Sequence, residues 1–247
     1  MDWLLLRGLA REQRHFGEFP ARFAAQVPDA RVRTLDLPGF GDQSARSSPT
    51  RVDAIVDDLR ARAFSRDTFP APRGLLALSL GGMVALRWAA RFPEDFARVV
   101  VVNTSSADLS PPWERFSLGV FARLPQLLAA GPLERERAIL SITSNRSAAD
   151  NEPVAQDWAR WFEERQPRRA NVLRQLVAAS RCRRPAHLDV PLLVLASRAD
   201  RLVSHRCSEK LAAALHAELR LHDAGGHDLS LDAPDWICDQ VRSFQSP

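Results

Sequence analysis

Short apolar runs recur along the chain and alternate with segments that have the periodicity of amphipathic helices. Six runs are nearly continuous in apolar residues, and they span residues 3–6, 32–37, 75–78, 99–102, 192–196 and 217–221. Such runs are typical of parallel strands that helices cover on both faces of a sheet. Helices are expected between them, at residues 14–26, 51–63, 83–91, 208–215 and 234–244. The repeated β-α pattern predicts a doubly wound α/β fold.

One long segment interrupts this pattern. From about residue 107 to residue 186 the sequence contains no convincing strand, and helices are expected at residues 113–130, 133–143, 152–165 and 170–182. A segment of this length is too long for a single crossover between strands. We therefore expect an α/β core formed by residues 1–106 and 187–247, with residues 107–186 inserted as an all-helical cap.

The composition is that of an ordinary globular protein, with 45% hydrophobic and 26% charged residues among 247. The formal net charge of +4 would by itself suggest that the protein binds nucleic acid. All but one of the 34 basic residues are arginine, however, and Lys210 is the single lysine. The arginines are spread along the chain among 30 acidic residues, which is typical of a codon bias and not of a binding patch. No nucleic-acid partner is therefore expected.

Membrane spans, disulfides and zinc sites are not expected either. No stretch approaches the roughly 20 consecutive apolar residues that a membrane helix needs. Residues 1–8 have no basic region ahead of their apolar run, so a core strand is expected here and not a signal peptide. Cys182, Cys207 and Cys238 are too few and too widely spaced for a disulfide framework or a zinc site. This cysteine usage fits the reducing cytoplasm, where we expect the protein to act.

The sharpest chemical signal is a serine between an apolar strand and a helix. Ser79 follows the run 75–78 and precedes Gly81 and Gly82. This is the context of a nucleophile elbow, usually G-x-S-x-G, in which the residues two positions before and after the serine are small. Ala77 and Gly81 meet this requirement, although Ala77 departs from the usual glycine. Ser79 is therefore a candidate nucleophile, and a helix N-cap in a glycine-rich turn is the structural alternative.

A nucleophilic serine requires a base and an acid that orients the base, and after an elbow they follow in the order aspartate, histidine. Asp200 lies just after one predicted strand, and His227 lies in a glycine-rich loop after the next. All three candidates thus fall at carboxyl ends of strands, on the side where open α/β sheets bind ligands. Asp108, which follows an earlier strand, is the alternative acid.

Two backbone N–H groups are expected to form an oxyanion hole, which stabilises negative charge that develops on a substrate. One belongs to Leu80, the residue after the candidate nucleophile. The other belongs to Leu9, in the loop after the first predicted strand, where Gly8 allows close approach of the backbone.

Together these residues make the chain resemble an α/β-hydrolase with a helical cap, over essentially its whole length. The segment Asp36-Leu37-Pro38-Gly39-Phe40-Gly41 is similar to the D-x-P-G-x-G turn of many such hydrolases, and the segment around Gly226-His227 is similar to their histidine loop. This turn and the S-L-G-G elbow are similar to those of pimeloyl-acyl-carrier-protein methyl ester esterases. General carboxylesterases share both features.

The resemblance implies an α/β-hydrolase fold with no metal and no organic cofactor. Relatives usually have two further strands before the first strand of this chain. A reduced, mostly parallel sheet of six strands is therefore expected, in the order 4-3-5-6-7-8 of the family's scheme. Relatives also usually have His-Gly where this chain has Arg7-Gly8. Arg7 is therefore expected at the mouth of the pocket, as a substrate-binding residue.

The expected cap contains two patterns that bear on function. Seven arginines and no acidic residue lie between positions 165 and 184: Arg165, Arg168, Arg169, Arg174, Arg181, Arg183 and Arg184. They form either a solvated helix face, or a docking surface for an acidic acyl carrier protein or a site for a substrate carboxylate. Trp158 and Trp161, with the neighbouring Phe162, either line the substrate pocket or pack the cap on the core.

Residues and resemblance together predict a serine hydrolase that cleaves a carboxylic ester through an acyl-enzyme, such as a methyl ester of a carrier-bound acyl chain. In this prediction Ser79 attacks the ester, His227 transfers the proton and Asp200 orients the histidine. A thioesterase, a C–C bond hydrolase and a cofactor-free perhydrolase use the same triad, so these alternatives stay open. A non-catalytic protein of the same fold that binds a small ligand or a protein is a further alternative.

Overall fold

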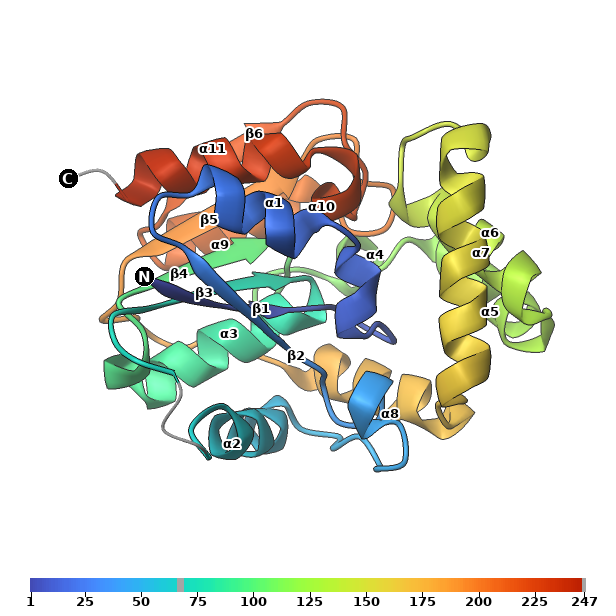
Figure 1. Ribbon diagram of the computed structural model, residues 1–247, viewed down its shortest axis with the longest axis horizontal. Helices are drawn as coiled ribbons and strands as arrows, with labels where there is room; N and C mark the ends of the chain where they lie inside the picture. The colour runs from blue at the N-terminus through green and yellow to red at the C-terminus, as the bar shows by residue number, and fades with distance from the viewer. Residues whose placement is uncertain (66–68, 246–247) are drawn as a thin grey trace.

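Six parallel strands form one sheet through the middle of the protein (Figure 1). The computed structural model describes residues 1–65 and 69–245. The strands lie in the order β2-β1-β3-β4-β5-β6, and their bounds are β1 Asp2–Leu6, β2 Arg31–Leu35, β3 Arg73–Leu78, β4 Arg98–Val102, β5 Leu192–Ser197 and β6 Glu218–His222. Every neighbouring pair is parallel. For the described residues, the parallel sheet of six strands that the resemblance implies is therefore confirmed, including its strand order.

Helices cover both faces of this sheet. One face packs against α1 (Phe19–Gln26) and α11 (Pro234–Gln245), and the other against α2 (Val52–Ala63), α3 (Leu80–Arg91) and α9 (His205–Ala214). Along β1, Trp3 and Leu5 belong to the core under α1 and α11, whereas Leu4 and Leu6 belong to the opposite core. Because successive side chains point to opposite faces and both faces are covered, the strand is apolar at every one of these positions.

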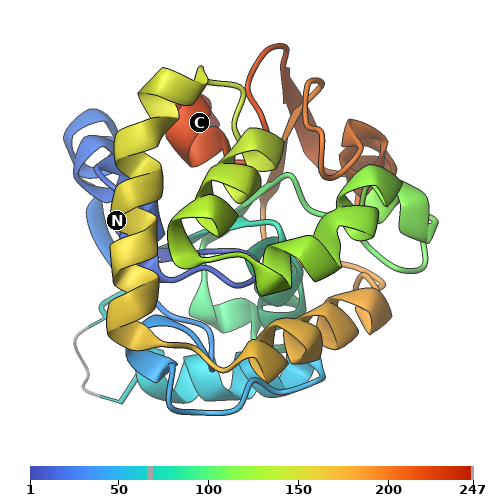
Figure 2. The ribbon, with the colours of Figure 1, turned by 90° about the vertical axis from the view of Figure 1, so that its right-hand side faces the viewer.

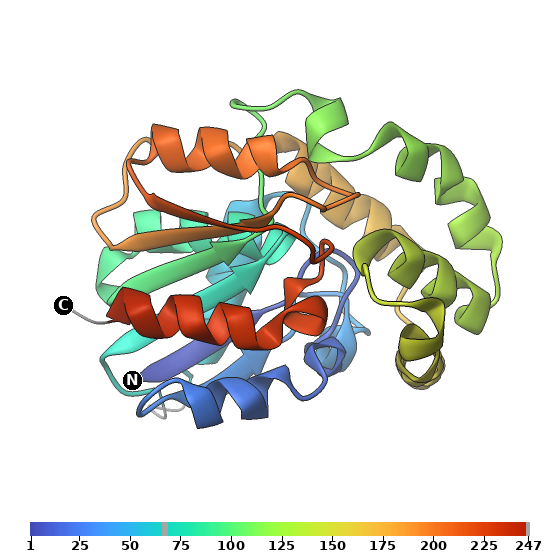
Figure 3. The ribbon, with the colours of Figure 1, turned by 90° about the horizontal axis from the view of Figure 1, so that it is seen from above.

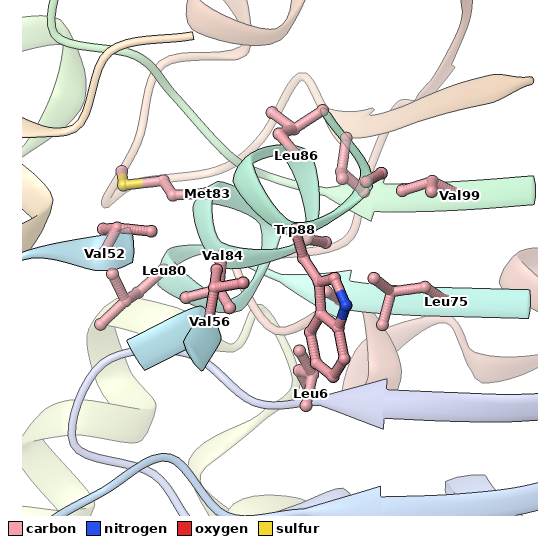
Figure 4. Close-up of a cluster of buried hydrophobic side chains, with 14 of the residues drawn as sticks. Leu6, Val52, Val56, Leu75, Leu80, Met83, Val84, Leu86, Trp88 and Val99 are labelled. Atoms are coloured by element: carbon pink, nitrogen blue, oxygen red, sulfur yellow. The ribbon is translucent and has the colours of Figure 1, made fainter. Parts of the chain in front are cut away.

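The helix that follows Ser79 is fixed to the sheet by a large aromatic side chain. Figure 4 shows Trp88 of α3 with Leu75 of β3 and Leu6 of β1 in the same buried cluster. The Trp88 ring is fully buried, and its Nε1 donates a hydrogen bond to Oδ2 of Asp95 at 2.7 Å. Since its one polar atom is paired, the indole adds apolar burial without an unsatisfied donor.

Five helices, which we call the cap helices, occupy the chain between β4 and β5: α4 Pro112–Arg115, α5 Leu118–Ala129, α6 Pro132–Thr143, α7 Ala148–Arg165 and α8 Arg169–Arg181. Helices α5, α6 and α7 lie beyond the carboxyl ends of the strands, with α6 packed along α7 (Figures 1, 2 and 3). Two hydrogen bonds from Asn171 join α8 to the core. Its Nδ2 donates to the carbonyl of Gly39 (3.1 Å), and its Oδ1 accepts from the N–H of Ser48 (2.9 Å). The division of the chain at residues 107 and 186 stays a prediction.

Two helices expected from the sequence are each broken in the structure. The segment 14–26 forms a 3-10 turn, Gln13–Phe16, and then α1, because Gly17 adopts a φ of 53° that ends the first turn. The segment 113–130 forms α4 and α5, separated at Phe116 and Ser117. Phe116 is extended, and the Ser117 N–H donates to the carbonyl of Leu202 at 2.9 Å instead of continuing the helix.

The three cysteines are free and buried. Burial raises the pKa of Cys182 to about 11 and that of Cys238 to about 12, so both thiols stay protonated near neutral pH. Within the residues that the structure describes, no helix is both long enough and apolar enough to cross a membrane.

Candidate active site

Ser79 lies on a strained turn between β3 and α3. Its φ of 54° and ψ of −117° are unusual for a residue with a side chain. Its N–H donates to the carbonyl of Val102 (2.8 Å), and its own carbonyl accepts from Oγ1 of Thr104 (2.8 Å). Both contacts come from the end of β4 and the residues after it, so the neighbouring strand holds the turn in place.

Glycines allow the chain after β1 to approach this turn. A Cβ atom on Gly81 would lie 2.6 Å from the carbonyl oxygen of Arg7, and one on Gly8 would lie 3.0 Å from Cβ of Ser79. The loop that contains Leu9 is therefore packed directly beside the candidate nucleophile. Among the described residues, neither the N–H of Leu9 nor that of Leu80 has a protein acceptor. Both groups remain free to donate to a ligand.

His227 and Asp200 are in direct contact. Nδ1 of His227 lies 2.7 Å from Oδ2 of Asp200, whose side chain is only 1% exposed. The other carboxylate oxygen, Oδ1, accepts from the N–H groups of Leu202 (2.8 Å) and Val203 (3.0 Å). These bonds fix the carboxylate, and the carboxylate in turn fixes the plane of the imidazole ring.

The alternative acid, Asp108, makes different contacts. It accepts hydrogen bonds from the hydroxyl of Ser106 and from the N–H of Arg184 (3.0 Å). Its carboxylate also lies 3.6 Å from the Arg184 side chain. Asp108 therefore links the end of the cap helices to the chain after β4, and Asp200 is the acid beside His227.

The environment of His227 favours its protonated form. Burial alone would lower the pKa of His227, but the negative charge of Asp200 and its hydrogen bond outweigh burial and raise it above its usual value. Asp228 raises the same pKa further, and Arg7 lowers it. An imidazole in this setting is stabilised when it takes up a proton, as a general base requires.

Arg7 and Asp228 form a buried ion pair that the sequence analysis missed. Nη1 of Arg7 donates to Oδ1 of Asp228 (3.1 Å) and Nη2 donates to Oδ2 (2.5 Å), with side chains 5% and 6% exposed. Nη1 also donates to Oγ of Ser230 (2.8 Å). The pair joins the loop after β1 to the loop that contains His227. Arg7 lines the cavity, but its guanidinium is buried and largely paired with Asp228, so its role in substrate binding stays a prediction.

Asn103 is a second supporting residue that the sequence analysis missed. Its Nδ2 donates to the carbonyl of His227 (2.7 Å), and its Oδ1 accepts from the N–H of Ser197 (2.9 Å). It adopts a φ of 49° directly after β4. A polar residue that ends a continuous apolar run was the available sequence signal, since it falls at the same edge of the sheet as the candidate triad.

Ser79 and His227 line one cavity of about 190 Å³. Its wall is mainly apolar and includes Leu9, Phe40, Leu78, Phe116, Ile139 and Phe162. Trp158 and Trp161 are not among the lining residues. Their rings pack edge-on against His15, at centroid distances of 4.8 and 5.6 Å, because His15 fills the space between the core and α7.

No group of three or more histidine, cysteine or acidic side chains is placed to hold a metal ion in residues 1–65 and 69–245. That the protein uses no organic cofactor remains an expectation from the resemblance.

A parallel sheet covered by helices, with a serine on a strained turn and a histidine–aspartate pair beside the same cavity, is the arrangement that defines α/β hydrolases. The sequence model of the alpha/beta hydrolase family matches residues 3–240, and the chain belongs to this family. The resemblance inferred from the motifs is thereby confirmed.

Relatives within this family have names that describe different reactions. The chain is 31% identical over 178 residues to the "Putative carbamate hydrolase RutD" of Cronobacter sakazakii, a match that covers 65% of this chain and 60% of that protein. It is 26% identical over 225 residues to a pimeloyl-acyl-carrier-protein methyl ester esterase of Vibrio vulnificus, covering 88% and 84%. A meta-cleavage product hydrolase (CumD) of Pseudomonas fluorescens has the same fold, with a TM-score of 0.78 at 16% identity over 99% of this chain and 90% of that one.

The match to some curated relatives is partial. The chain spans 60% of the length of the Cronobacter protein and only 17% of that of another curated relative. The family and the fold follow from these comparisons, whereas the substrate does not.

Proposed function

We propose that the protein is a serine hydrolase that cleaves a carboxylic ester through an acyl-enzyme. Ser79 attacks the acyl carbon, while His227 accepts the proton of the serine hydroxyl and then gives it to the leaving alcohol. Asp200 orients His227 and stabilises the imidazolium. The N–H groups of Leu9 and Leu80 donate to the oxyanion of the tetrahedral intermediate. A water molecule then releases the acid from Ser79 by the same steps.

The observation that carries this proposal is the 2.7 Å contact between His227 and Asp200, in the cavity that Ser79 also lines. The contact occupies Nδ1 of His227 and leaves Nε2 to act as the base. The strained turn at Ser79 supports the same assignment, because such strain is concentrated where a side chain must be held for function.

An ester with short substituents fits the cavity best. At about 190 Å³ it is smaller than the ~300–1,000 Å³ typical of pockets for drug-sized ligands, and its wall is mainly apolar. The esterase names among the relatives favour an oxygen ester. Thioester hydrolysis, C–C bond hydrolysis and perhydrolysis use the same three residues, so they are the alternatives that a substrate screen must separate.

A carrier-bound substrate is the finer part of this proposal. Of the seven arginines between positions 165 and 184, Arg165 pairs with Asp42 and Arg184 with Asp108, and Arg174 donates to the carbonyl of Ser48. Arg168, Arg169, Arg181 and Arg183 are exposed. An exposed surface with this charge would attract an acidic acyl carrier protein.

Replacement of Ser79 tests the proposed reaction. A fluorophosphonate probe is expected to label the protein, and Ser79→Ala is expected to abolish both labelling and ester hydrolysis. The fold should be kept, because the substitution removes one hydroxyl and creates no clash. A folded Ser79→Ala protein that still turned over p-nitrophenyl esters at a near-normal rate would rule out Ser79 as the nucleophile.

A substrate screen then separates ester hydrolysis from its alternatives. p-Nitrophenyl esters of increasing acyl length and the matching acyl thioesters are compared by kcat/KM. The highest values are expected for short oxygen esters. A clear preference for thioesters would show that the triad is correct and that the proposed substrate class is wrong.

A further inference from the structure

A cluster of three charged side chains lies on the wall of the cavity that contains Ser79. Arg11 comes from the loop after β1, and Arg135 and Glu136 come from α6. Nη1 of Arg11 donates to Oε2 of Glu136 (2.7 Å), and Nε of Arg135 donates to Oε1 of the same carboxylate (3.2 Å). The Glu136 carboxylate therefore bridges two guanidinium groups in a cavity that is otherwise mainly apolar.

Each of the two arginines keeps an unused donor. Nη2 of Arg11 and Nη2 of Arg135 are buried and have no hydrogen-bond partner among the described residues. The two side chains are only 10% and 14% exposed. A buried charged donor without an acceptor is costly, so the great majority of such groups are paired in folded proteins. Both of these donors belong to residues that line one cavity, where an acceptor on a ligand would satisfy them.

Aromatic rings hold both guanidinium groups in position. Cζ of Arg11 lies 4.4 Å from the centroid of a Trp158 ring, and Cζ of Arg135 lies 3.5 Å from that of Phe162. Stacking engages the flat face of a guanidinium and leaves its in-plane N–H groups available. The donors are therefore preorganised, and Trp158 contributes to the cavity through Arg11 without lining it.

The cluster has an unbalanced positive charge. It contains two guanidinium groups and one carboxylate. Arg7 and Asp228 neutralise each other in their own ion pair. Burial, with the positive charges of Arg11 and Arg7, holds the pKa of His15 well below its usual range, so this neighbouring ring is neutral. One further negative charge would balance the cluster.

We infer that Arg11 and Arg135 form a subsite for a carboxylate of the substrate, which is therefore an ester with a free carboxylate away from the scissile bond. This inference rests on the proposed ester hydrolysis at Ser79. It favours a free acid that carries an ester over a carrier-bound methyl ester, because both ends of that acyl chain are esterified and neither is a carboxylate. A carboxylate suits the site because its oxygens accept in the plane of a guanidinium and its single charge balances the cluster. A phosphate dianion would instead place excess negative charge in an apolar cavity.

Binding of adipate, a dicarboxylate, to the Ser79→Ala protein tests the subsite without turnover. Calorimetry is expected to detect adipate, and a second substitution, Arg11→Gln or Arg135→Gln, is expected to weaken binding about 10- to 100-fold. Adipamide has the same chain without charge and is expected to bind much more weakly than adipate. Arg137→Gln is the matched control, since Arg137 is also in α6 but is half-exposed and paired with Glu152.

Turnover shows on which side of the ester the carboxylate lies. Monomethyl adipate carries it on the acyl side, and the acetate ester of γ-hydroxybutyrate carries it on the alcohol side. Dimethyl adipate and butyl acetate are their neutral counterparts. One anionic ester is expected to exceed its neutral counterpart in kcat/KM about 10-fold or more, and Arg135→Gln is expected to remove this preference. Circular dichroism and fluorophosphonate labelling verify that the variant is folded.

The outcomes separate this inference from the proposed function. Equal binding of adipate and adipamide, with equal turnover of anionic and neutral esters, would overturn the subsite and leave ester hydrolysis intact. Failure of every ester to react, with Ser79 unlabelled, would overturn the proposed function. In that case adipate binding and its loss on Arg135→Gln would still decide whether the subsite exists.

Discussion

His227 lies in a buried network with two carboxylates and one guanidinium. Asp200 contacts its Nδ1, and Asp228, the next residue in the chain, is held by Arg7. Burial lowers the pKa of His227, the charge and hydrogen bond of Asp200 raise it, and Asp228 and Arg7 add smaller effects of opposite sign. Each of these side chains therefore changes the pH above which His227 is a neutral base.

Asp200→Asn is expected to cut kcat by about 10³- to 10⁴-fold, because an amide does not hold the histidine tautomer or stabilise the imidazolium. The wild-type pKa of His227 is raised, so activity is expected to rise through a step above the usual histidine value of about 6.5. Loss of the carboxylate removes the main cause of that increase, and the step moves to lower pH. The pH dependence of kcat/KM measures both effects. If Asp108→Asn were the more damaging change, Asp200 would not be the orienting acid.

Variants of Arg7 and Asp228 are expected to shift the pKa of His227 in opposite directions. Arg7→Gln removes a positive charge that lowers the pKa of His227, so the step in the pH profile is expected to move up. Asp228→Asn removes a negative charge that raises this pKa, so the step is expected to move down. Shifts in the same direction would show that the variants act by disturbing the loop and not through charge.

The effects of Arg7 and Asp228 variants on the free energy of unfolding are expected not to be additive. Removing one partner leaves a buried charge unpaired, and each single variant should lower the free energy of unfolding by about 3–5 kcal/mol. The double variant Arg7→Gln/Asp228→Asn should lose clearly less than the sum of the two, because neither buried charge then remains. Denaturant titration of the four proteins gives the coupling free energy.

Among the elements, the close approach of β1 to the start of α3 brings the loop with Leu9 beside Ser79. The approach requires that position 81 has no side chain, since a Cβ there would meet the carbonyl oxygens of Leu6 (2.9 Å) and Arg7 (2.6 Å). These are backbone atoms and do not move aside like the end of a flexible side chain. The geometry of the expected oxyanion hole thus depends on the glycine at position 81.

Gly81→Ala is therefore expected to push the loop after β1 away from Ser79. The clash should lower the free energy of unfolding by about 1–3 kcal/mol and reduce kcat, because one oxyanion donor is displaced. Gly119→Ala is the matched control, as Gly119 is exposed in α5 and the new Cβ would lie 3.9 Å from Oγ of Ser117, an ordinary van der Waals contact. The control should keep full activity and gain slightly in stability. Equal behaviour of the two variants would contradict this role of Gly81.

At the scale of the whole molecule, the exposed arginines on and next to α8 test the carrier-bound part of the proposal. Arg168, Arg181 and Arg183 are exposed and do not line the cavity, so they are suitable for charge reversal. Arg169 lines the cavity and Arg174 bonds the core, so changes there would affect more than a docking surface.

Changing Arg168, Arg181 and Arg183 together to glutamate is expected to slow turnover of a carrier-bound methyl ester at low salt, because encounter with an acidic carrier depends on long-range attraction. Turnover of a small neutral ester should be unchanged. The effect should fade as salt shortens the screening length to about 8–10 Å, and the triple glutamine variant should be intermediate. Equal rates on the carrier substrate before and after charge reversal would exclude docking at this surface.

The sequence by itself determined the sheet and the order of the candidate triad. Continuous apolar runs require burial on both faces, which a parallel sheet between helices provides. The carboxyl ends of parallel strands meet at one edge, so Ser79, Asp200 and His227 were expected to converge although they are far apart in the chain. The helix boundaries were less certain, because Gly17 and the bond from Ser117 to Leu202 end helices for reasons outside the apolar periodicity.

Only the tertiary structure decided which charged residues lie together in the cavity. Arg7 and Asp228 are 221 residues apart, and Arg11 and Glu136 are 125 apart. The chain has 33 arginines, and the neighbouring residues in the sequence do not distinguish the few that are buried and paired from the others. Their partners are set by how the cap helices pack over the end of the sheet. The charge of the cavity follows from that packing, because a buried guanidinium acts only on the groups within its reach.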